Sequence, residues 1–299
     1  MTRRRTAQTY TPNYPLEKTT TMHIPTSQST TTRPTFILGV GAQKAGTTWL
    51  YQNLQSDPHV NMGCLKEYHV WDTKFRPQAS PAMVKHIESS DTPPNTLRRL
   101  FIQNEGLYER YFESLISDNI RTTGDITPNY CHLDTEHFKS VRQCLMGAGF
   151  RVKVVFLMRD PVNRCWSSLR MKDRNENKKK WRPLKNRELN CQFPHIASSA
   201  DCKQRTMYEH TVTAIRASFN SKDIYFGFFE SMFEPVNIQK LSNFLGVKLD
   251  ISASNQKENT SPPAKINEDN ITLCKSLYRN TYEFCFDQFP ESRSLWRSL

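Results

Sequence analysis

Residues 36–56 read FILGVGAQKAGTTWLYQNLQS, and this stretch decides the fold class. The segment Phe36–Gly41 is apolar apart from its glycines, which predicts a strand buried in a core. After a glycine-containing turn, apolar side chains from Thr47 to about Ser56 fall on one side of a predicted helix, which Pro58 closes. A strand that runs through a short turn into a helix is the first half of an α/β unit.

The rest of the chain repeats this alternation of strand and helix. Apolar and amphipathic segments predict strands at His59–Met62, Val152–Met158 and Ile224–Phe228, and helices at Leu107–Ile116, from about Pro161, at Val236–Leu245 and at Ile271–Phe286. Such alternation favours a central parallel sheet flanked by helices. We therefore predict an α/β fold with one domain at residues 34–299, preceded by a disordered tail at residues 1–33 that is rich in Thr, Ser and Pro.

The charge of the chain points to anionic partners. Over 299 residues the formal net charge is +12, and only five of the 41 Lys and Arg residues precede Pro34, so the excess belongs mainly to the predicted domain. Nucleic acid, a membrane surface, an acidic glycan and a phosphorylated cofactor would all satisfy it. No apolar stretch approaches the roughly 20 residues needed to span a bilayer. The basic N-terminus also lacks the apolar run of a secretory signal, so no transmembrane segment is predicted.

The eight cysteines are scattered along the chain, and no two have CxxC spacing. They therefore predict neither a disulfide scaffold nor a zinc site, and we expect reduced thiols. Cys191 and Cys202 flank a short segment, and an oxidising compartment would allow them to pair.

The turn after the first strand, Gly41–Thr48, is the first candidate binding site. Unpaired N–H groups at the start of the following helix attract an anionic phosphate, glycines let the backbone approach it, and Lys44 adds a full charge. The candidate cofactor-binding residues in this turn are Gly41, Gln43, Lys44, Ala45, Gly46, Thr47 and Thr48. The pattern departs from GxxxxGK[ST], because Thr47 stands where a nucleotidase has its lysine. The alternative is a simple glycine turn between strand and helix.

A second candidate phosphate site follows the predicted strand Val152–Met158. Arg159 leaves the carboxyl end of this strand, where ligands gather in open α/β sheets. Pro161 suits the first position of a helix, and Ser167 lies about two helical turns further on. Arg159 and Ser167 would hold a phosphate, the arginine by a forked, charge-assisted contact. The alternative is an ordinary helix start with a surface arginine.

Four segments resemble, in order and spacing, the sulfotransferases that use PAPS (3′-phosphoadenosine 5′-phosphosulfate). The turn around Lys44 is similar to their 5′-phosphosulfate loop, and Arg159–Ser167 is similar to their 3′-phosphate motif. Lys-Glu-Tyr-His-Val-Trp-Asp at 66–72 resembles the Lys-Glu-Pro-His-Phe-Phe-Asp segment of Golgi glycan sulfotransferases, with tyrosine in place of proline. Gly-Asp-Ile-Thr-Pro-Asn-Tyr at 124–130 resembles their Gly-Glu-Lys-Thr-Pro-x-Tyr segment. The likeness runs, with gaps, from about residue 36 to residue 245 and implies a P-loop-like sulfotransferase fold.

The resemblance implies how the donor is held. Lys44 would neutralise charge on the bridging oxygen as PAP leaves, and Gly46, Thr47 and Thr48 would cradle the 5′-phosphate. Arg159 and Ser167 would hold the 3′-phosphate.

The resemblance also implies how the acceptor is activated. Glu67 would be the general base that removes the acceptor proton; otherwise it is a surface carboxylate paired with Lys66. His69 has a pKa suited to the same task and ranks second, since a histidine between Tyr and Trp is more often packed. Asp72 would orient a neighbour or bind the acceptor. The residues expected to shape the acceptor cleft are Thr127, Pro128 and Tyr130.

The predicted reaction is transfer of a sulfuryl group from PAPS to a hydroxyl of a carbohydrate or small molecule. No metal is expected, because Lys44 handles the leaving group and the central strand runs into Arg159 rather than an acidic residue. The basic segment Lys172–Arg187 would attract an acidic acceptor, or it is a solvated loop. The expected location is the cytoplasm, or the Golgi lumen if the sequence is a trimmed form.

Two other classes of function stay open at this point. A P-loop kinase would bind ATP with Mg²⁺, although the displaced lysine speaks against it. A nucleic-acid-binding protein would use the net charge, and its affinity would fall steeply with salt; the resemblance implies no nucleic-acid partner. The identity of the acceptor and the oligomeric state do not follow from the sequence.

Overall fold

The computed structural model describes residues 33–177, 184–250 and 264–296. The chain separates into Met1–Thr32 and Arg33–Leu299, and the described residues all belong to the second unit. The predicted disordered tail therefore lies outside the described residues apart from Arg33, and so does the middle of the basic segment Lys172–Arg187.

The described residues form a four-stranded parallel sheet with the order β2-β1-β3-β4. Its strands are β1 Thr35–Gly41, β2 Thr122–Ile126, β3 Arg151–Met158 and β4 Ile224–Phe228. The central strands β1 and β3 are buried almost throughout, as strands covered by helices on both faces should be. This sheet confirms the predicted α/β fold. Because all four strands are parallel, their carboxyl ends lie along one edge.

Strand β2 was not predicted, and a strand predicted at His59–Met62 is wrong. The sequence of β2, TTGDI, contains one aliphatic residue, yet every residue in it is buried. Tertiary contacts satisfy its polar groups; the Thr123 hydroxyl, for example, donates to the Asn61 carbonyl at 2.7 Å. Residues 59–62 run beside β2 but make only one isolated bridge, between Val60 and Thr122.

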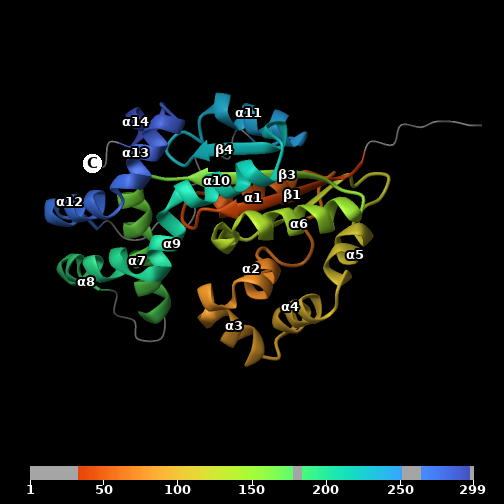
Figure 1. Ribbon diagram of the computed structural model, residues 1–299, viewed down its shortest axis with the longest axis horizontal. Coiled ribbons are helices and arrows are strands. Elements are labelled where there is room, and N and C mark those ends of the chain that lie inside the picture. Colours follow the sequence, from red (N-terminus) through yellow and green to blue (C-terminus); the bar gives the residue numbers. More distant parts are fainter. Residues whose placement is uncertain (1–32, 178–183, 251–263, 297–299) are drawn as a thin grey trace, which may run out of the picture. The chain divides into compact units, whose positions relative to one another are not determined.

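Helices cover the sheet, and two groups of them stand out in Figure 1: α2–α4 and α7–α9. The helices are α1 Thr47–Ser56, α2 Val70–Phe75, α3 Pro81–Glu88, α4 Pro93–Gln103, α5 Leu107–Ser114, α6 Thr135–Gly147, α7 Pro161–Asn177, α8 Asn186–Ser198, α9 Ala200–Thr206, α10 Tyr208–Ser218, α11 Pro235–Leu245, α12 Glu268–Leu277, α13 Arg279–Gln288 and α14 Ser292–Leu295, with short 3₁₀ turns η1 Pro77–Ala79, η2 Pro128–His132 and η3 Ser221–Asp223. The turn η2 contacts both groups, through α2 and through α9.

The helices predicted at 47–56, 107–116, from Pro161 and at 236–245 are confirmed. The single helix predicted at Ile271–Phe286 is wrong: α12 and α13 meet at Tyr278, whose backbone (φ −111°, ψ 24°) is not helical. The Tyr278 side chain is buried and its hydroxyl donates to the Ala197 carbonyl of α8 at 2.6 Å. That tertiary contact fixes the break.

An aromatic cluster joins the sheet to the segment that follows α1. Phe36 of β1 packs edge-on against Phe112 of α5 at 4.9 Å, and Phe112 packs against Tyr68 at 5.0 Å. Tyr68 is fully buried, and Tyr108 packs against it from α5 at 6.2 Å. The cluster thus fixes the backbone on either side of Tyr68 over the end of the sheet.

All eight cysteines are free thiols. The pairing considered for Cys191 and Cys202 is wrong, because Cys191 is exposed on α8 whereas Cys202 is buried on α9. The Cys202 sulfur lies 3.4 Å from the Cys165 sulfur of α7 instead. Within the described part of the chain, no helix has the length and apolar character needed to cross a membrane.

Candidate active site

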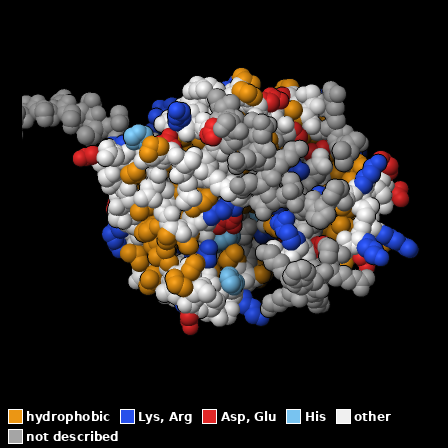
Figure 2. All heavy atoms as spheres, turned by 180° about the vertical axis from the view of Figure 1, so that it is seen from behind, with side chains coloured by type: hydrophobic (Ala, Val, Ile, Leu, Met, Phe, Trp, Pro, Cys, Tyr) orange, Lys and Arg blue, Asp and Glu red, His pale blue; other side chains and the backbone are white. Residues whose placement is uncertain are grey.

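A cavity of about 1320 Å³ lies at the carboxyl edge of the sheet, and residues following all four strands line it. Examples are Lys44 after β1, Asn129 after β2, Arg159 after β3 and Glu230 after β4. Side chains from α3, α7 and α9 complete the wall. On the face shown in Figure 2, Lys and Arg side chains gather around a hollow near the centre together with acidic and histidine side chains. Ligand sites in open α/β sheets lie at this edge.

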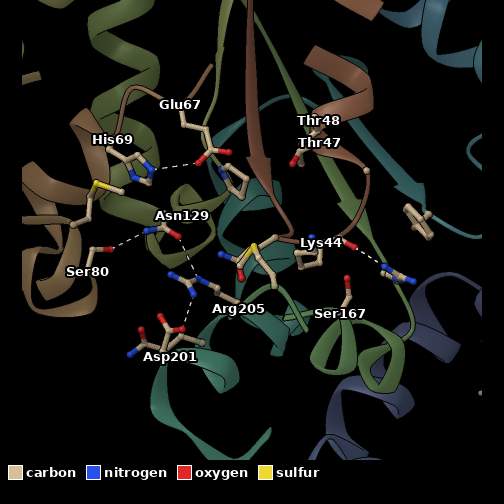
Figure 3. A pocket seen from close by; sticks show the side chains of 18 of the residues that line it. Lys44, Thr47, Thr48, Glu67, His69, Ser80, Asn129, Ser167, Asp201 and Arg205 are labelled. Carbon is tan, nitrogen blue, oxygen red and sulfur yellow. Dashed lines mark hydrogen bonds and ion pairs between the residues drawn. The ribbon is translucent and has the colours of Figure 1, made fainter. Parts of the chain in front are cut away.

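The structure brings most of the predicted site residues to this one cavity. Those that line it are Gln43, Lys44, Gly46, Thr47, Thr48, Glu67, His69, Pro128, Arg159 and Ser167. The others lie behind the wall, and these are Gly41, Ala45, Asp72, Thr127 and Tyr130. Figure 3 shows that the lining residues fall into two groups, with Lys44, Thr47, Thr48 and Ser167 on one side and Glu67, His69 and Asn129 on the other.

The turn after β1 has the backbone of an anion-binding loop. Lys44 and Gly46 both adopt positive φ angles, 71° and 93°, and Gly46 is the N-cap of α1. At Gly46 a side chain would also collide with Met232, since a Cβ atom would lie 2.4 Å from its sulfur. Gly46, Thr47 and Thr48 at the start of α1 line the cavity, and the start of a helix offers backbone N–H groups to an anion.

Positive charge is concentrated around Lys44. Burial, together with the charges of Arg174, Arg159, Lys66 and Arg170, lowers the pKa of Lys44 to about 8. These positive charges repel one another, and an anion bound among them would offset the repulsion. This part of the cavity is therefore electrostatically suited to a ligand with several negative charges.

Arg159 is fixed beside the turn with part of its guanidinium unused. Its Nη1 donates to the Lys44 carbonyl at 3.0 Å, and the group lies 4.1 Å from the centre of the Phe229 ring. Its Nε is buried and has no hydrogen-bond partner among the described residues. Ser167 of α7 lines the same side of the cavity. Because Arg159 lines the cavity, its guanidinium is placed to make a charge-assisted contact with an anionic ligand there.

The corner that carries Arg159 is supported from behind by the C-terminal helices. The backbone N–H of Asp160 donates to Glu230 Oε1 at 2.9 Å, and Trp296 Nε1 donates to Glu230 Oε2 at 3.1 Å. Tyr282 of α13 donates to Asp160 Oδ1 at 2.7 Å. Burial raises the pKa of Glu230.

Three aromatic side chains near the turn were not identified from the sequence. Trp49 and Phe233 meet edge-on at 5.6 Å, Phe233 and Phe229 at 5.3 Å, and all three line the cavity. Trp49 was assigned to the apolar face of its helix, which gave no indication that it also borders a ligand cavity. Flat aromatic walls suit the stacking of a nucleobase.

On the other side of the cavity, Glu67 is held by two cations. Lys66 Nζ lies 2.8 Å from Glu67 Oε1 and donates to Thr48 Oγ1 at 2.9 Å, so it connects Glu67 to the turn. His69 Nε2 lies 3.4 Å from Glu67 Oε2. Burial opposes ionisation of Glu67, but the hydrogen bond from His69 and the charge of Lys66 outweigh it and lower the pKa of Glu67 to about 2.

His69 lies between two carboxylates. Its Nδ1 is 2.9 Å from Asp72 Oδ2, and Asp72 is fully buried. Burial opposes the charged imidazolium, but the hydrogen bonds with Asp72 and Glu67 outweigh it and raise the pKa of His69 to about 9. At neutral pH His69 is therefore a cation that orients the Glu67 carboxylate. Asp72 in turn accepts from Asn129 Nδ2 at 3.2 Å and from the Ser80 hydroxyl at 3.4 Å.

Thr127 and Tyr130 support this side from behind. The buried Asp125 carboxylate accepts from Thr127 Oγ1 and from the Tyr130 hydroxyl, both at 2.6 Å, and burial raises the pKa of Asp125 to about 6. Thr127 Oγ1 also accepts from the backbone N–H of Tyr68 at 2.9 Å. A proline at position 68 would have no N–H to donate, so tyrosine at this position brings a contact that proline lacks.

Arg98 of α4 was also missed by sequence reasoning. Its Nη2 donates to the Glu67 carbonyl at 2.7 Å and its Nε to the Tyr68 carbonyl at 3.2 Å. Arg98 thus holds the backbone beneath Glu67, although it lies 31 residues further along the chain. No local pattern connects it to the site.

No group of three or more His, Cys, Asp or Glu side chains in the described ranges could hold a metal ion. Lys and Arg side chains line the cavity around Lys44, and Glu67 and His69 line its other side, with Asp72 buried behind His69.

A family model described as "Sulfotransferase family" matches residues 34–248. No curated protein sequence matches the chain. Among solved structures, a sulfotransferase from Alicyclobacillus acidocaldarius aligns with a TM-score of 0.60 and 20% identity, covering 89% of this chain and 99% of that one. Mouse sulfotransferase SULT7A1 complexed with PAP aligns with a TM-score of 0.47 and 15% identity, covering 89% of each chain.

Proposed function

The chain belongs to the sulfotransferase family, and from this premise we propose that it transfers a sulfuryl group from PAPS to a hydroxyl of an acceptor. One observation carries the proposal: the cation-rich turn beside Arg159 and the oriented Glu67 carboxylate lie on two sides of a single cavity. The first side suits a doubly phosphorylated nucleotide, and the second suits a hydroxyl that must lose its proton.

The donor side of the cavity would hold PAPS. The backbone N–H groups before α1, with the Thr47 and Thr48 hydroxyls, would bind the 5′-phosphosulfate. Arg159 and Ser167 would bind the 3′-phosphate, which distinguishes PAPS from ATP. The aromatic wall of Trp49 and Phe229 would take the adenine ring. PAPS supplies the sulfuryl group and leaves as PAP.

Glu67 is the better of the two candidate bases. His69, with a pKa of about 9, already carries its proton at neutral pH and cannot accept another. Glu67 is ionised over the whole working range, because its pKa is about 2. We propose that Glu67 accepts the acceptor proton as the acceptor oxygen bonds to sulfur, while His69 and Asp72 keep its carboxylate oriented. A pKa of 2 makes Glu67 a weak base, so its position contributes more than its basicity.

Lys44 would stabilise the leaving group. Bond cleavage between sulfur and the bridging oxygen leaves negative charge on the 5′-phosphate of PAP, and Lys44 lines the cavity within the turn that would hold this phosphate. Binding of the donor supplies the anion that Lys44 lacks, so its pKa rises again and it stays charged during the reaction. The absence of metal from the mechanism and a cytoplasmic location stay predictions from the sequence.

Ligand-dependent thermal unfolding tests the donor assignment. PAP should raise the Tm of the full chain more than ATP with Mg²⁺ does, because only PAP carries the 3′-phosphate. Arg159→Ala should abolish most of that shift, whereas Arg279→Ala, which changes an exposed arginine of α13 outside the cavity lining, should leave it unchanged. If ATP with Mg²⁺ stabilises the protein and PAP does not, the sulfotransferase proposal fails and a kinase-like activity replaces it.

A further inference from the structure

One side chain in the cavity is explained neither by donor binding nor by proton removal. Arg205 of α9 lies on the Glu67 side of the cavity, close to Asn129 and Asp201 (Figure 3). Arg205 does not belong to the group of cations around Lys44, since its charge is not among those named above as lowering the pKa of Lys44.

Two partners fix the Arg205 guanidinium. Its Nε donates to Asn129 Oδ1 at 3.2 Å, and its Nη1 donates to Asp201 Oδ2 at 2.5 Å. Asn129 is itself held by Asp72 and Ser80, through donation from its Nδ2 at 3.2 Å and 3.1 Å. The guanidinium is therefore oriented by the same network that orients His69.

The remaining nitrogen of Arg205 is available to a ligand. Within the described residues Nη2 makes no hydrogen bond, and it is not among the buried atoms that lack a partner. Arg205 lines the cavity, so this accessible nitrogen is within a side chain that a ligand in the cavity would meet. Because the rest of the guanidinium is already fixed, little side-chain entropy would be lost when this nitrogen binds a partner.

The positive charge of Arg205 is not cancelled by Asp201. The Asp201 side chain is 57% exposed, so water screens it, whereas that of Arg205 is only 14% exposed. The pKa of the neighbouring His132 depends on both charges. Burial and, after it, the charge of Arg205 lower this pKa to about 4, and the opposing effect of Asp201 is smaller. At His132, therefore, the charge of Arg205 has a larger effect than that of Asp201.

We propose that Arg205 binds an anionic group of the acceptor, so that the preferred substrates are hydroxyl compounds that also carry a carboxylate or a similar oxyanion. This inference rests on the proposed sulfotransferase function and names the acceptor class for it. A guanidinium N–H binds an ionised oxygen about twice as strongly as a neutral one. Arg205 is thus a specificity-determining residue on the acceptor side, and a neutral acceptor of the same shape binds more weakly.

A matched pair of sugars tests the proposal without requiring the natural acceptor. Protein saturated with PAP is titrated with 4-nitrophenyl β-D-glucuronide and, in parallel, with 4-nitrophenyl β-D-glucoside, which lacks the carboxylate, and thermal unfolding gives the two affinities. We expect the glucuronide to bind at least about tenfold more tightly, as one charge-assisted contact allows. Arg205→Ala should remove this difference, and Arg205→Lys should keep part of it.

Two further variants separate specificity from folding. Lys203→Ala removes an exposed cation from the same helix outside the cavity lining and should keep the preference for glucuronide. Asp201→Asn removes the competing carboxylate and should strengthen the preference. Equal affinity for the two sugars in the wild type, or an unchanged preference in Arg205→Ala, overturns the proposal. The shift caused by PAP alone is a separate measurement: its absence in the wild type would refute the donor assignment instead.

Discussion

The two sides of the cavity differ in how their charges are balanced. On the donor side Lys44, Arg159 and Arg170 lie close together, and their mutual repulsion helps to lower the pKa of Lys44. On the acceptor side charges alternate from Glu67 to His69 to Asp72, and each stabilises its neighbour. The donor side is thus incomplete until an anion binds, whereas the acceptor side is already organised. Donor binding should therefore change the energetics of the first side far more than those of the second.

The largest effect should come from removing the base on the acceptor side. Glu67→Gln should lower kcat by about 10²–10⁴, the contribution typical of a general base. Because Glu67 belongs to the internally balanced side, the Kd for PAP should change by less than about twofold. Steady-state kinetics and a PAP titration measure the two values. A large loss of PAP affinity would show that the two sides are not independent.

Removal of the Lys44 charge should lower kcat without lowering the stability of the ligand-free protein. Lys44→Met should lower kcat by about 10²–10³, the cost of losing one group that stabilises charge in the transition state. The ligand-free protein should nevertheless be as stable as the wild type or more stable, because one charge of a repelling set has gone. Thermal unfolding without ligand provides the check, and a Tm several degrees lower would argue against repulsion on the donor side.

As pH rises, the contributions of the two sides to the stability of the protein should change in opposite directions. The pKa of His69 is raised from 6.5 to about 9, so its stabilising contribution is complete below pH 6.5 and is lost as pH rises to 9. The pKa of Lys44 is lowered from 10.5 to about 8, so stability is regained between pH 8 and 10.5. In the wild type, the deprotonation of His69 should lower the free energy of unfolding by at most about 3 kcal/mol between pH 6.5 and 9, and His69→Gln should abolish this decrease. Denaturant unfolding across this range, compared with the wild type, tests the sign; an unchanged pH dependence would contradict it.

The smallest effect should come from the residue that connects the sides. Lys66 contacts both Thr48 and Glu67, but its side chain and that of Glu67 are each about one-third exposed. Lys66→Met should therefore change the free energy of unfolding by less than about 1 kcal/mol. It should also raise the pKa of Glu67, since one of the two cations has been removed. Urea unfolding and the acid limb of the kcat profile measure these two changes.

The placement of the residues around Lys44 at one cavity could be predicted from the sequence because local backbone builds this side. The apolar run before the turn, the glycines and the helix start lie within residues 36–56, and Arg159 directly follows a second apolar strand. The residues that form each of these strands, turns and helices are close together in the chain, so the hydrophobic pattern of the sequence predicts them correctly.

The acceptor side could be predicted only in part, because distant side chains build it. The resemblance drew attention to Glu67 and His69, but nothing near Arg98 or Arg205 in the sequence connects them to the site. Strand β2 escaped prediction because its buried residues are mostly polar: Asp125 is satisfied by the hydroxyl groups of Tyr108 in α5, of Thr127 and of Tyr130 in η2. Hydrogen bonds between side chains leave no periodic signal in the sequence.

The contact of Trp296 with Glu230 has a consequence for exchanging parts between relatives. The matched family region ends at residue 248, yet Trp296 and Tyr282 beyond it hold the corner that carries Arg159. Residues 34–248 are thus not a self-sufficient module. We expect that a chimera that kept this region but took its C-terminal helices from another protein would bind PAP more weakly, although every residue proposed to contact PAP would be unchanged.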